Sequence, residues 1–250
     1  MTYEIILLFA IGAGGGFISG LVGIGGAIII YPAILLIPPL FGFSSMSPYL
    51  ASGLTSAQVF FSTLSGAFSA KKKPEFSSHL VLNMGSGMFL GSIIGASMAN
   101  ALNATFVNTV YIIIAILALL LLFFKVTPKP QKSNFNPILL IGIGLVIGTL
   151  SGIVGAGGAF IITPILLAVF KLPMNTVVAN SIVIAFISSI GAFAMKAFQG
   201  HIPLDLAIAI ILGSIIFAPI GLRIGRRISS SIQKGIISFL IIIAIIQLIF

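Results

Sequence analysis

The sequence contains no cysteine, two histidines, three acidic residues and twelve lysines and arginines. The absence of cysteine excludes disulfides, thiolate metal sites and thiol-based catalysis. Because the histidines and acids are scattered along the chain, they form no metal-ligand cluster, and we expect no metal or other cofactor. The sequence also has no nucleotide-binding P-loop, which excludes ATP coupling within this chain.

Charge is scarce in general. Charged residues make up 6% of the chain, and none lies from Ile5 to Ala70. That run is several times longer than the roughly 20 residues needed for one helical crossing. Hydrophobic residues make up 59% and the mean hydropathy is +1.29. A soluble domain of this size could not cover its surface with so few polar groups, so the chain is predicted to be embedded in the lipid bilayer.

Alternating strand patterns are absent, and runs of Leu, Ile, Ala and Gly dominate, so the fold class is predicted to be an all-α polytopic membrane protein. The net charge of +9 fits basic cytoplasmic loops better than nucleic-acid binding, and no nucleic-acid partner is expected. The hydropathy pattern predicts ten segments, at 4–20, 25–40, 47–70, 76–100, 104–124, 137–151, 157–170, 174–197, 203–226 and 231–250.

The basic residues fall almost entirely on one side of this arrangement. Following the chain through the segments puts all but Lys196 on the side opposite the N-terminus. These residues are Lys71, Lys72, Lys73, Lys125, Lys129, Lys132, Lys171, Arg223, Arg226, Arg227 and Lys234. By the positive-inside rule this side is cytoplasmic, so the chain is predicted to be a multi-pass protein of the cell membrane with both termini extracytoplasmic.

One motif occurs twice. The nine residues from Ser19 to Ala27, SGLVGIGGA, return from Ser151 to Ala159 as SGIVGAGGA, and a proline follows each copy. Each copy interrupts an apolar stretch, so the flanking segments either cross fully or form re-entrant or strongly kinked helix pairs. Each half makes an odd number of crossings. The chain is therefore predicted to contain two inverted repeats of about five segments, 1–124 and 138–250, joined by a cytoplasmic linker at 125–137.

Later parts of the two halves also correspond. Ser65–Phe68 parallels Ile190–Phe193, and Ala51-Ser52 parallels Ala179-Asn180. The pairs Gly91/Gly95 and Gly221/Gly225 are also equivalent, and their spacing is typical of close helix packing.

The two glycine loops are the strongest candidate for a binding site. Each precedes a helix whose first N–H groups have no intrahelical partners and carry partial positive charge. Two such ends brought together near the bilayer midplane would hold an anion without a basic side chain, and we expect no buried Lys or Arg in the spans. The candidate substrate-binding residues, which add polar side chains of the third and eighth segments, are Gly23, Gly25, Gly26, Gly155, Gly157, Gly158, Ser52, Thr55, Gln58, Asn180 and Ser181.

The ionisable residues all lie near segment ends. Glu75, His79, Lys196, His201 and Asp205 are therefore expected at the membrane interface. His201 and Asp205 are four residues apart at the start of the ninth segment, so they could pair on one helical face and take part in proton coupling.

The duplicated glycine motif, the stretches that open the third and eighth segments, and the run from Gln199 to Asp205, QGHIPLD, together resemble the TauE/SafE family of sulfite exporters. The resemblance covers essentially the whole chain, although the segment from Lys71 to Phe76 lacks a glycine-containing turn like that of the second half. It implies transport of sulfite, a sulfonate or a related organosulfur anion.

The leading hypothesis is therefore a secondary transporter, not an enzyme, that moves a small anion by alternating access. Proton, anion or sodium gradients could drive it, in either direction, and a homo-oligomer is compatible with the sequence. The alternatives are an anion channel, a carrier of small carboxylates, or a structural subunit. A membrane-embedded enzyme is disfavoured because the spans lack convergent acids and bases.

Overall fold

The structure is a computed structural model that describes residues 2–22, 26–123, 135–225 and 227–249. The described residues form ten α-helices and one short 3₁₀ turn, η1. They are α1 (Thr2–Val22), α2 (Ala27–Leu40), α3 (Pro48–Ala70), α4 (Ser78–Met98), η1 (Ala99–Ala101), α5 (Ala104–Phe123), α6 (Pro137–Val154), α7 (Ala159–Ala168), α8 (Met174–Phe198), α9 (Leu204–Gly225) and α10 (Ser230–Ile249). Every helix boundary lies within three residues of the boundary expected from the sequence, so the all-helical prediction is confirmed.

Local sequence explains where the central helices begin. The Ser47 hydroxyl caps α3 by accepting the Leu50 N–H at 3.3 Å, and Pro48 occupies the first turn. Asn136 caps α6 in the same way, again followed by a proline. Both helices therefore start where the apolar runs start.

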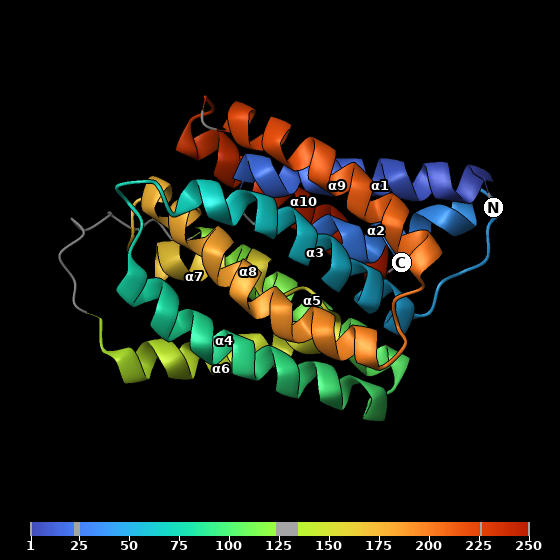
Figure 1. The fold of residues 1–250 in the computed structure, drawn as a ribbon, viewed down its shortest axis with the longest axis horizontal. Helices are drawn as coiled ribbons and strands as arrows, with labels where there is room; N and C mark the ends of the chain where they lie inside the picture. The colour runs from blue at the N-terminus through green and yellow to red at the C-terminus, as the bar shows by residue number, and fades with distance from the viewer. Residues whose placement is uncertain (1, 23–25, 124–134, 226, 250) are drawn as a thin grey trace.

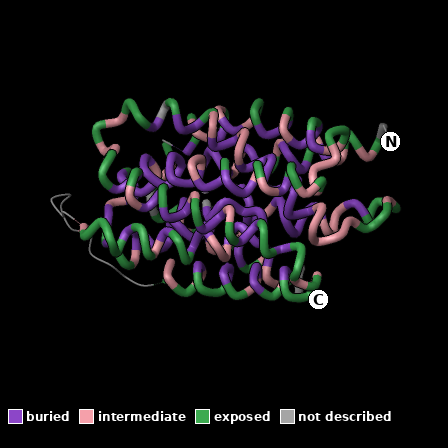
Figure 2. Tube along the Cα trace, turned by 60° about the horizontal axis from the view of Figure 1, so that its bottom comes forward, coloured by how far each residue is buried: buried purple, intermediate pink, exposed green. Residues whose placement is uncertain are grey.

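Six helices are long and apolar enough to cross a membrane: α1, α4 with η1, α5, α6, α8 and α9. Two shorter apolar helical stretches are Ala27–Leu40, which is α2, and Ser231–Ile246 within α10. Many apolar side chains face outward from the bundle, for example Ile138, Val146 and Leu120. The interior is buried and the exposed positions lie along the outside (Figure 2). An apolar exterior of this kind suits a surface that is solvated by lipid.

The halves of the chain are interlaced by two long helix pairs. Helix α1 packs along α9, and α4 packs along α6, while α3 and α8 cross in the centre (Figure 1). Glycines allow each close approach. A methyl group on Gly16 would overlap the backbone of Ser214, and one on Gly148 would overlap the backbone of Met88.

The expected packing role of the equivalent glycine pairs is confirmed. Gly91 and Gly95 of α4 lie against backbone atoms of α6, and Gly221 and Gly225 of α9 lie against backbone atoms of α1. Helix α1 begins, and helix α10 ends, at the same end of the bundle, and the turn between α3 and α4 lies at the opposite end (Figure 1).

Candidate functional site

Both glycine motifs coincide with helix breaks. Helix α1 ends at Val22 and α2 begins at Ala27. Of the first motif, Gly23 and Gly25 lie outside the described residues. Gly26 precedes α2 with a φ of 75°, a left-handed conformation that favours glycine. No side chain caps the N-terminus of α2.

The second motif is described in full. Helix α6 ends at Val154 and α7 begins at Ala159. Gly155, Gly157 and Gly158 between them all have positive φ, of 78°, 57° and 68°. Gly158 holds the same position before α7 that Gly26 holds before α2, and α7 also lacks a side-chain cap. Each short helix therefore starts with N–H groups that no side chain covers.

The two breaks meet beside the middle of α3. A Cβ placed on Gly26 would lie 3.1 Å from Nε2 of Gln58, and one placed on Gly157 would lie 3.2 Å from Cγ1 of Val59. Residues 58 and 59 are central in α3, which runs from Pro48 to Ala70. Consecutive residues of one helix thus face the two breaks.

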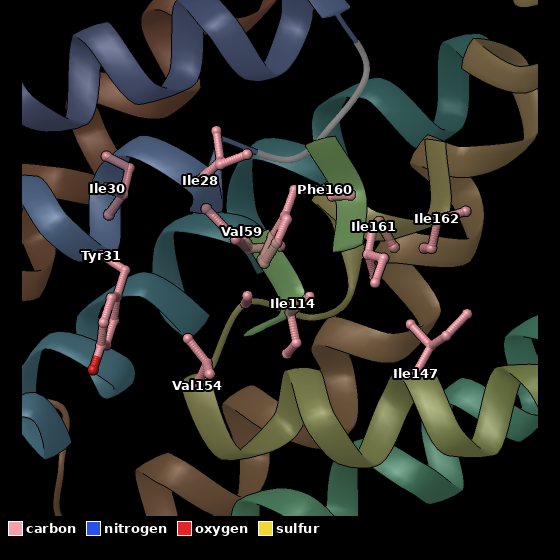
Figure 3. Packing of buried hydrophobic residues seen from close by; sticks show 14 of the residues in the cluster. Ile28, Ile30, Tyr31, Val59, Ile114, Ile147, Val154, Phe160, Ile161 and Ile162 are labelled. Atoms are coloured by element: carbon pink, nitrogen blue, oxygen red, sulfur yellow. The ribbon is translucent and has the colours of Figure 1, made fainter. Parts of the chain in front are cut away.

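Tyr111 of α5 connects the starts of the two short helices. Its hydroxyl donates to the carbonyl oxygen of Ile28 at 2.5 Å, and its ring centroid lies 5.8 Å from that of Phe160. Ile28 and Phe160 are the second residues of α2 and α7, and both belong to the packed core shown in Figure 3. The breaks are therefore neighbours in space, not features of opposite ends of the molecule.

Several buried polar atoms near the breaks have no hydrogen-bond partner among the described residues. They are Oγ1 of Thr55, both amide atoms of Gln58, Oγ of Ser151 and Oγ1 of Thr163. Ser151 Oγ lies 3.2 Å from the Cβ position of Gly158. Each helix start thus has an unpaired polar side chain beside it, Gln58 at α2 and Ser151 at α7. Such groups are costly to bury unless something else binds them.

Polar residues form a continuous stripe along α3. Ser52, Thr55, Gln58, Ser62 and Ser65 are spaced three or four residues apart, which places them on one helical face. The Ser52 hydroxyl donates to the carbonyl oxygen of Ile153 at 3.3 Å, and the Ser19 hydroxyl donates to Ser62 Oγ at 3.4 Å. The stripe therefore passes both breaks and runs along most of the helix.

A cavity of about 570 Å³ opens at the end of the bundle where α3 and α9 end. Lys72, Lys73 and Glu75 contribute charges to its wall, and Gly20 and Leu21 bring it to the first glycine motif. A second cavity of about 230 Å³ shares Gly20 and Leu222 with the first, and adds Ser62, Ser65 and Arg223. We call the two cavities together the vestibule; it joins basic side chains at the surface to the polar stripe of α3. The sequence suggested only a topological role for these basic residues.

Asn180 has a different environment from Gln58. Its Nδ2 donates to the carbonyl oxygens of Glu75 and Thr176 at 2.9 and 2.7 Å, and its Oδ1 accepts the Ser77 N–H at 2.8 Å. The bonds to Glu75 and Ser77 hold the turn between α3 and α4 against α8, and the bond to Thr176 lies within α8, so the structure gives Asn180 an anchoring role. Ser181, the next residue, is buried in α8.

His201 and Asp205 do not pair. Asp205 is exposed in the first turn of α9, whereas the His201 ring stacks on Tyr49 with centroids 5.8 Å apart. Burial of the His201 ring, and secondarily the positive charge of nearby Lys196, lower the pKa of His201. His201 Nδ1 is buried and has no partner in the described chain.

The expectation for Lys196 was wrong. Its side chain is completely buried, and Nζ donates to the carbonyl oxygen of Ile153, at the second glycine break, at 3.4 Å. Its position near the end of the eighth predicted segment indicated the membrane interface, and α8 does end two residues later, at Phe198. The expectation that the spans bury no lysine was wrong for the same reason.

The family model described as "Sulfite exporter TauE/SafE" matches residues 8–248. The chain belongs to the TauE/SafE family. Like its relatives in that family, it is a multi-pass membrane transporter and not an enzyme.

Curated relatives from Bacillus subtilis and an archaeon match this TauE/SafE chain over most of their length. The probable membrane transporter protein YunE is 26% identical over 98% of the chain and 97% of the relative. The probable membrane transporter protein YjnA is 26% identical over 100% of both. The probable membrane transporter protein MJ0441 of Methanocaldococcus jannaschii is 25% identical over 89% of the chain and 87% of the relative. No solved structure matches this TauE/SafE chain.

Proposed function

We propose that this transporter moves a small oxyanion, such as sulfite, a sulfonate or a related organosulfur anion, across the cytoplasmic membrane by alternating access. The binding site lies where the starts of α2 and α7 meet the middle of α3. The observation that carries this proposal is the polar side chain beside each helix start that has no partner in the described part of the chain, Gln58 near Gly26 and Ser151 near Gly158. Helix N-termini attract anions, and these side chains supply the additional hydrogen bonds.

The packing supports two inverted repeats. When α1–α5 are matched in order with α6–α10, the pair α1–α9 corresponds to the pair α6–α4, and α2–α3 corresponds to α7–α8. Helix α1 begins at one end of the bundle and α6 begins at the other (Figure 1). This is the arrangement expected of halves related by a two-fold axis in the membrane plane, with substrate bound at their interface.

The vestibule supports an entry route from the cytoplasm. Its wall carries Lys72, Lys73 and Arg223, and by the positive-inside rule this basic end faces the cytoplasm and both termini face outward. Basic side chains at the mouth of a low-dielectric cavity raise the local concentration of anions. The stripe on α3 then continues inward to Gln58.

The function is tested by flux of sulfite into proteoliposomes that contain the purified protein. We expect saturable uptake, faster with sulfite preloaded on the opposite side, because a carrier exchanges its substrate between two closed states. Gln58→Met and Ser151→Ala are expected to lower this uptake. Ser56→Ala is a matched control, because the buried Ser56 hydroxyl already donates to the Gly53 carbonyl of its own helix.

Large single-channel currents would show that the protein is an anion channel and not a carrier. Transport of acetate and not of sulfite would change the substrate class to small carboxylates. Normal sulfite uptake by both Gln58→Met and Ser151→Ala would show that the binding site does not lie at the glycine breaks.

A further inference from the structure

Lys196 is the one charged side chain among the described residues that is completely buried. Its ammonium group has three donors, yet it makes one long hydrogen bond of 3.4 Å to a carbonyl oxygen that already accepts a hydrogen bond from Ser52. No carboxylate among the described residues pairs with it: Asp205 is exposed in α9, Glu75 lies beside Asn180 at the other end of α8, and Glu4 lies in the first turn of α1. A buried cation with so few partners in a membrane protein points to a ligand that supplies the missing negative charge.

The surroundings of Lys196 also lack partners. Oε1 of Gln199 and Nδ1 of His201 are buried and unpaired in the described chain. The backbone N–H of His201 donates to the Lys196 carbonyl at 3.0 Å, so the turn after α8 closes on the backbone of this lysine. The polar stripe of α3 reaches the same place through Ser52. Lys196 therefore lies at the end of the stripe opposite the vestibule.

The repeat gives Lys196 a counterpart. The seven residues from Ser65 to Lys71 are SGAFSAK, and those from Ile190 to Lys196 are IGAFAMK. Each run closes the third helix of its half, and each ends in lysine. The two lysines differ in environment: Lys71 is exposed at the end where the vestibule opens, whereas Lys196 is buried.

The partner of Lys196 is duplicated as well. Ile153 in SGIVG corresponds to Leu21 in SGLVG. The carbonyl oxygen of Ile153 accepts from Lys196, whereas the carbonyl oxygen of Leu21, which lines the vestibule, accepts from Nε2 of Gln233 at 3.4 Å. The position of Ile153 is thus closed by a lysine, whereas the equivalent position of Leu21 borders a cavity.

We propose that Lys196 binds the transported oxyanion in the outer half of the pathway, and that its bond to Ile153 closes that half in the state described here. Lys71 is its counterpart in the inner half. This proposal rests on the proposed function, because it assigns a residue to the same pathway. The ammonium exchanges the carbonyl oxygen for an oxyanion when the outer end opens, which replaces a weak hydrogen bond by a charge-assisted one.

The closing role is tested without any anion. The chain has no cysteine, so Ser52→Cys introduces a single thiol next to Lys196 and Ile153. In purified protein we expect slow labelling of this thiol by fluorescein maleimide, and labelling about tenfold faster or more when Lys196→Met is added, because the closing bond is lost. Lys234→Met, which removes a lysine from α10, is the control and should leave labelling slow.

The anion-binding role is tested by sulfite flux. Lys196→Gln keeps a donor for Ile153 but removes the charge, so the KM for sulfite is expected to rise about tenfold or more, with Lys196→Arg closer to the wild type. The melting temperature of Lys196→Gln serves as the check on folding. A purely structural role for Lys196 predicts instead an unchanged KM with a lower melting temperature.

The proposal stands only if both results are obtained. Equal labelling of Ser52→Cys with and without Lys196, or an unchanged KM in Lys196→Gln, overturns it. Absence of sulfite flux in the wild-type protein overturns the proposed function and with it the anion-binding role of Lys196, and the labelling comparison then tests the closing role alone.

Discussion

Replacing Gln58 by methionine is expected to make the protein more stable and less active. Both amide atoms of Gln58 are buried without a partner among the described residues, and leaving a buried polar group such as this amide unpaired costs about 1–3 kcal/mol. Methionine has a similar length and adapts to irregular packing, so it removes this cost and leaves little empty space. We expect the free energy of unfolding to rise by about 1–3 kcal/mol.

The matched control is the other buried amide, Asn180. Its side chain makes three hydrogen bonds. Asn180→Leu removes all three, and at about 1 kcal/mol each it should lower the free energy of unfolding by about 3 kcal/mol. Two amide-to-apolar changes in adjacent helices therefore have opposite expected signs.

The assay is thermal unfolding of both variants and the wild type in one detergent, with and without sulfite. Sulfite should raise the melting temperature of the wild type by linkage and should do so less for Gln58→Met, because the amide contributes to binding. A loss of stability in Gln58→Met similar to that of Asn180→Leu would refute the reasoning, since it would mean that the Gln58 amide is already well bonded in the folded protein.

Three further predictions use other parts of the molecule. Gly148→Ala should destabilise the protein by about 1–3 kcal/mol, because the new methyl group overlaps the α4 backbone. Gly142→Ala in the same helix meets open space and should stabilise the protein by up to about 1 kcal/mol. Thermal unfolding of the two variants compares these effects. Tyr111→Phe removes the hydrogen bond to the Ile28 carbonyl, so it should lower the free energy of unfolding by about 1–2 kcal/mol and slow sulfite uptake. Uptake equal to that of the wild type would contradict this prediction. The lowered pKa of His201 means that the folded protein binds fewer protons than the unfolded chain, so stability should fall as the pH drops below about 6.5 and recover above it. In His201→Gln that part of the pH dependence of the melting temperature should disappear. An unchanged pH profile in this variant would contradict the assignment.

The helices could be predicted from the sequence because membrane-spanning segments are recognised by their apolar composition. Long apolar runs end at charged or proline-rich turns, as at Lys71–Pro74, and these turns mark the helix boundaries closely. The duplicated motif predicted that the two glycine breaks lie close together. The environments of single polar residues did not follow, because they depend on contacts between distant parts of the chain.

Asn180 and Lys196 illustrate that limit from two directions. Asn180 aligned with Ser52 in the repeat, yet its partners include Glu75, more than a hundred residues away. Lys196 lay near a helix end, where lysines usually extend to the interface. One signal in the sequence pointed to it: SGAFSAK and IGAFAMK end in the same residue type, and Lys196 is the single basic residue on its side of the predicted topology.

The positions of Gln58 and Val59 have a mechanical consequence. Successive side chains on an α-helix point about 100° apart. Any roll of α3 about its own axis that brings Gln58 closer to Gly26 therefore swings Val59 relative to Gly157 by the same angle. The starts of α2 and α7 are therefore coupled through α3. A rotation of α3 that shortens its contact with one glycine break also changes its contact with the other.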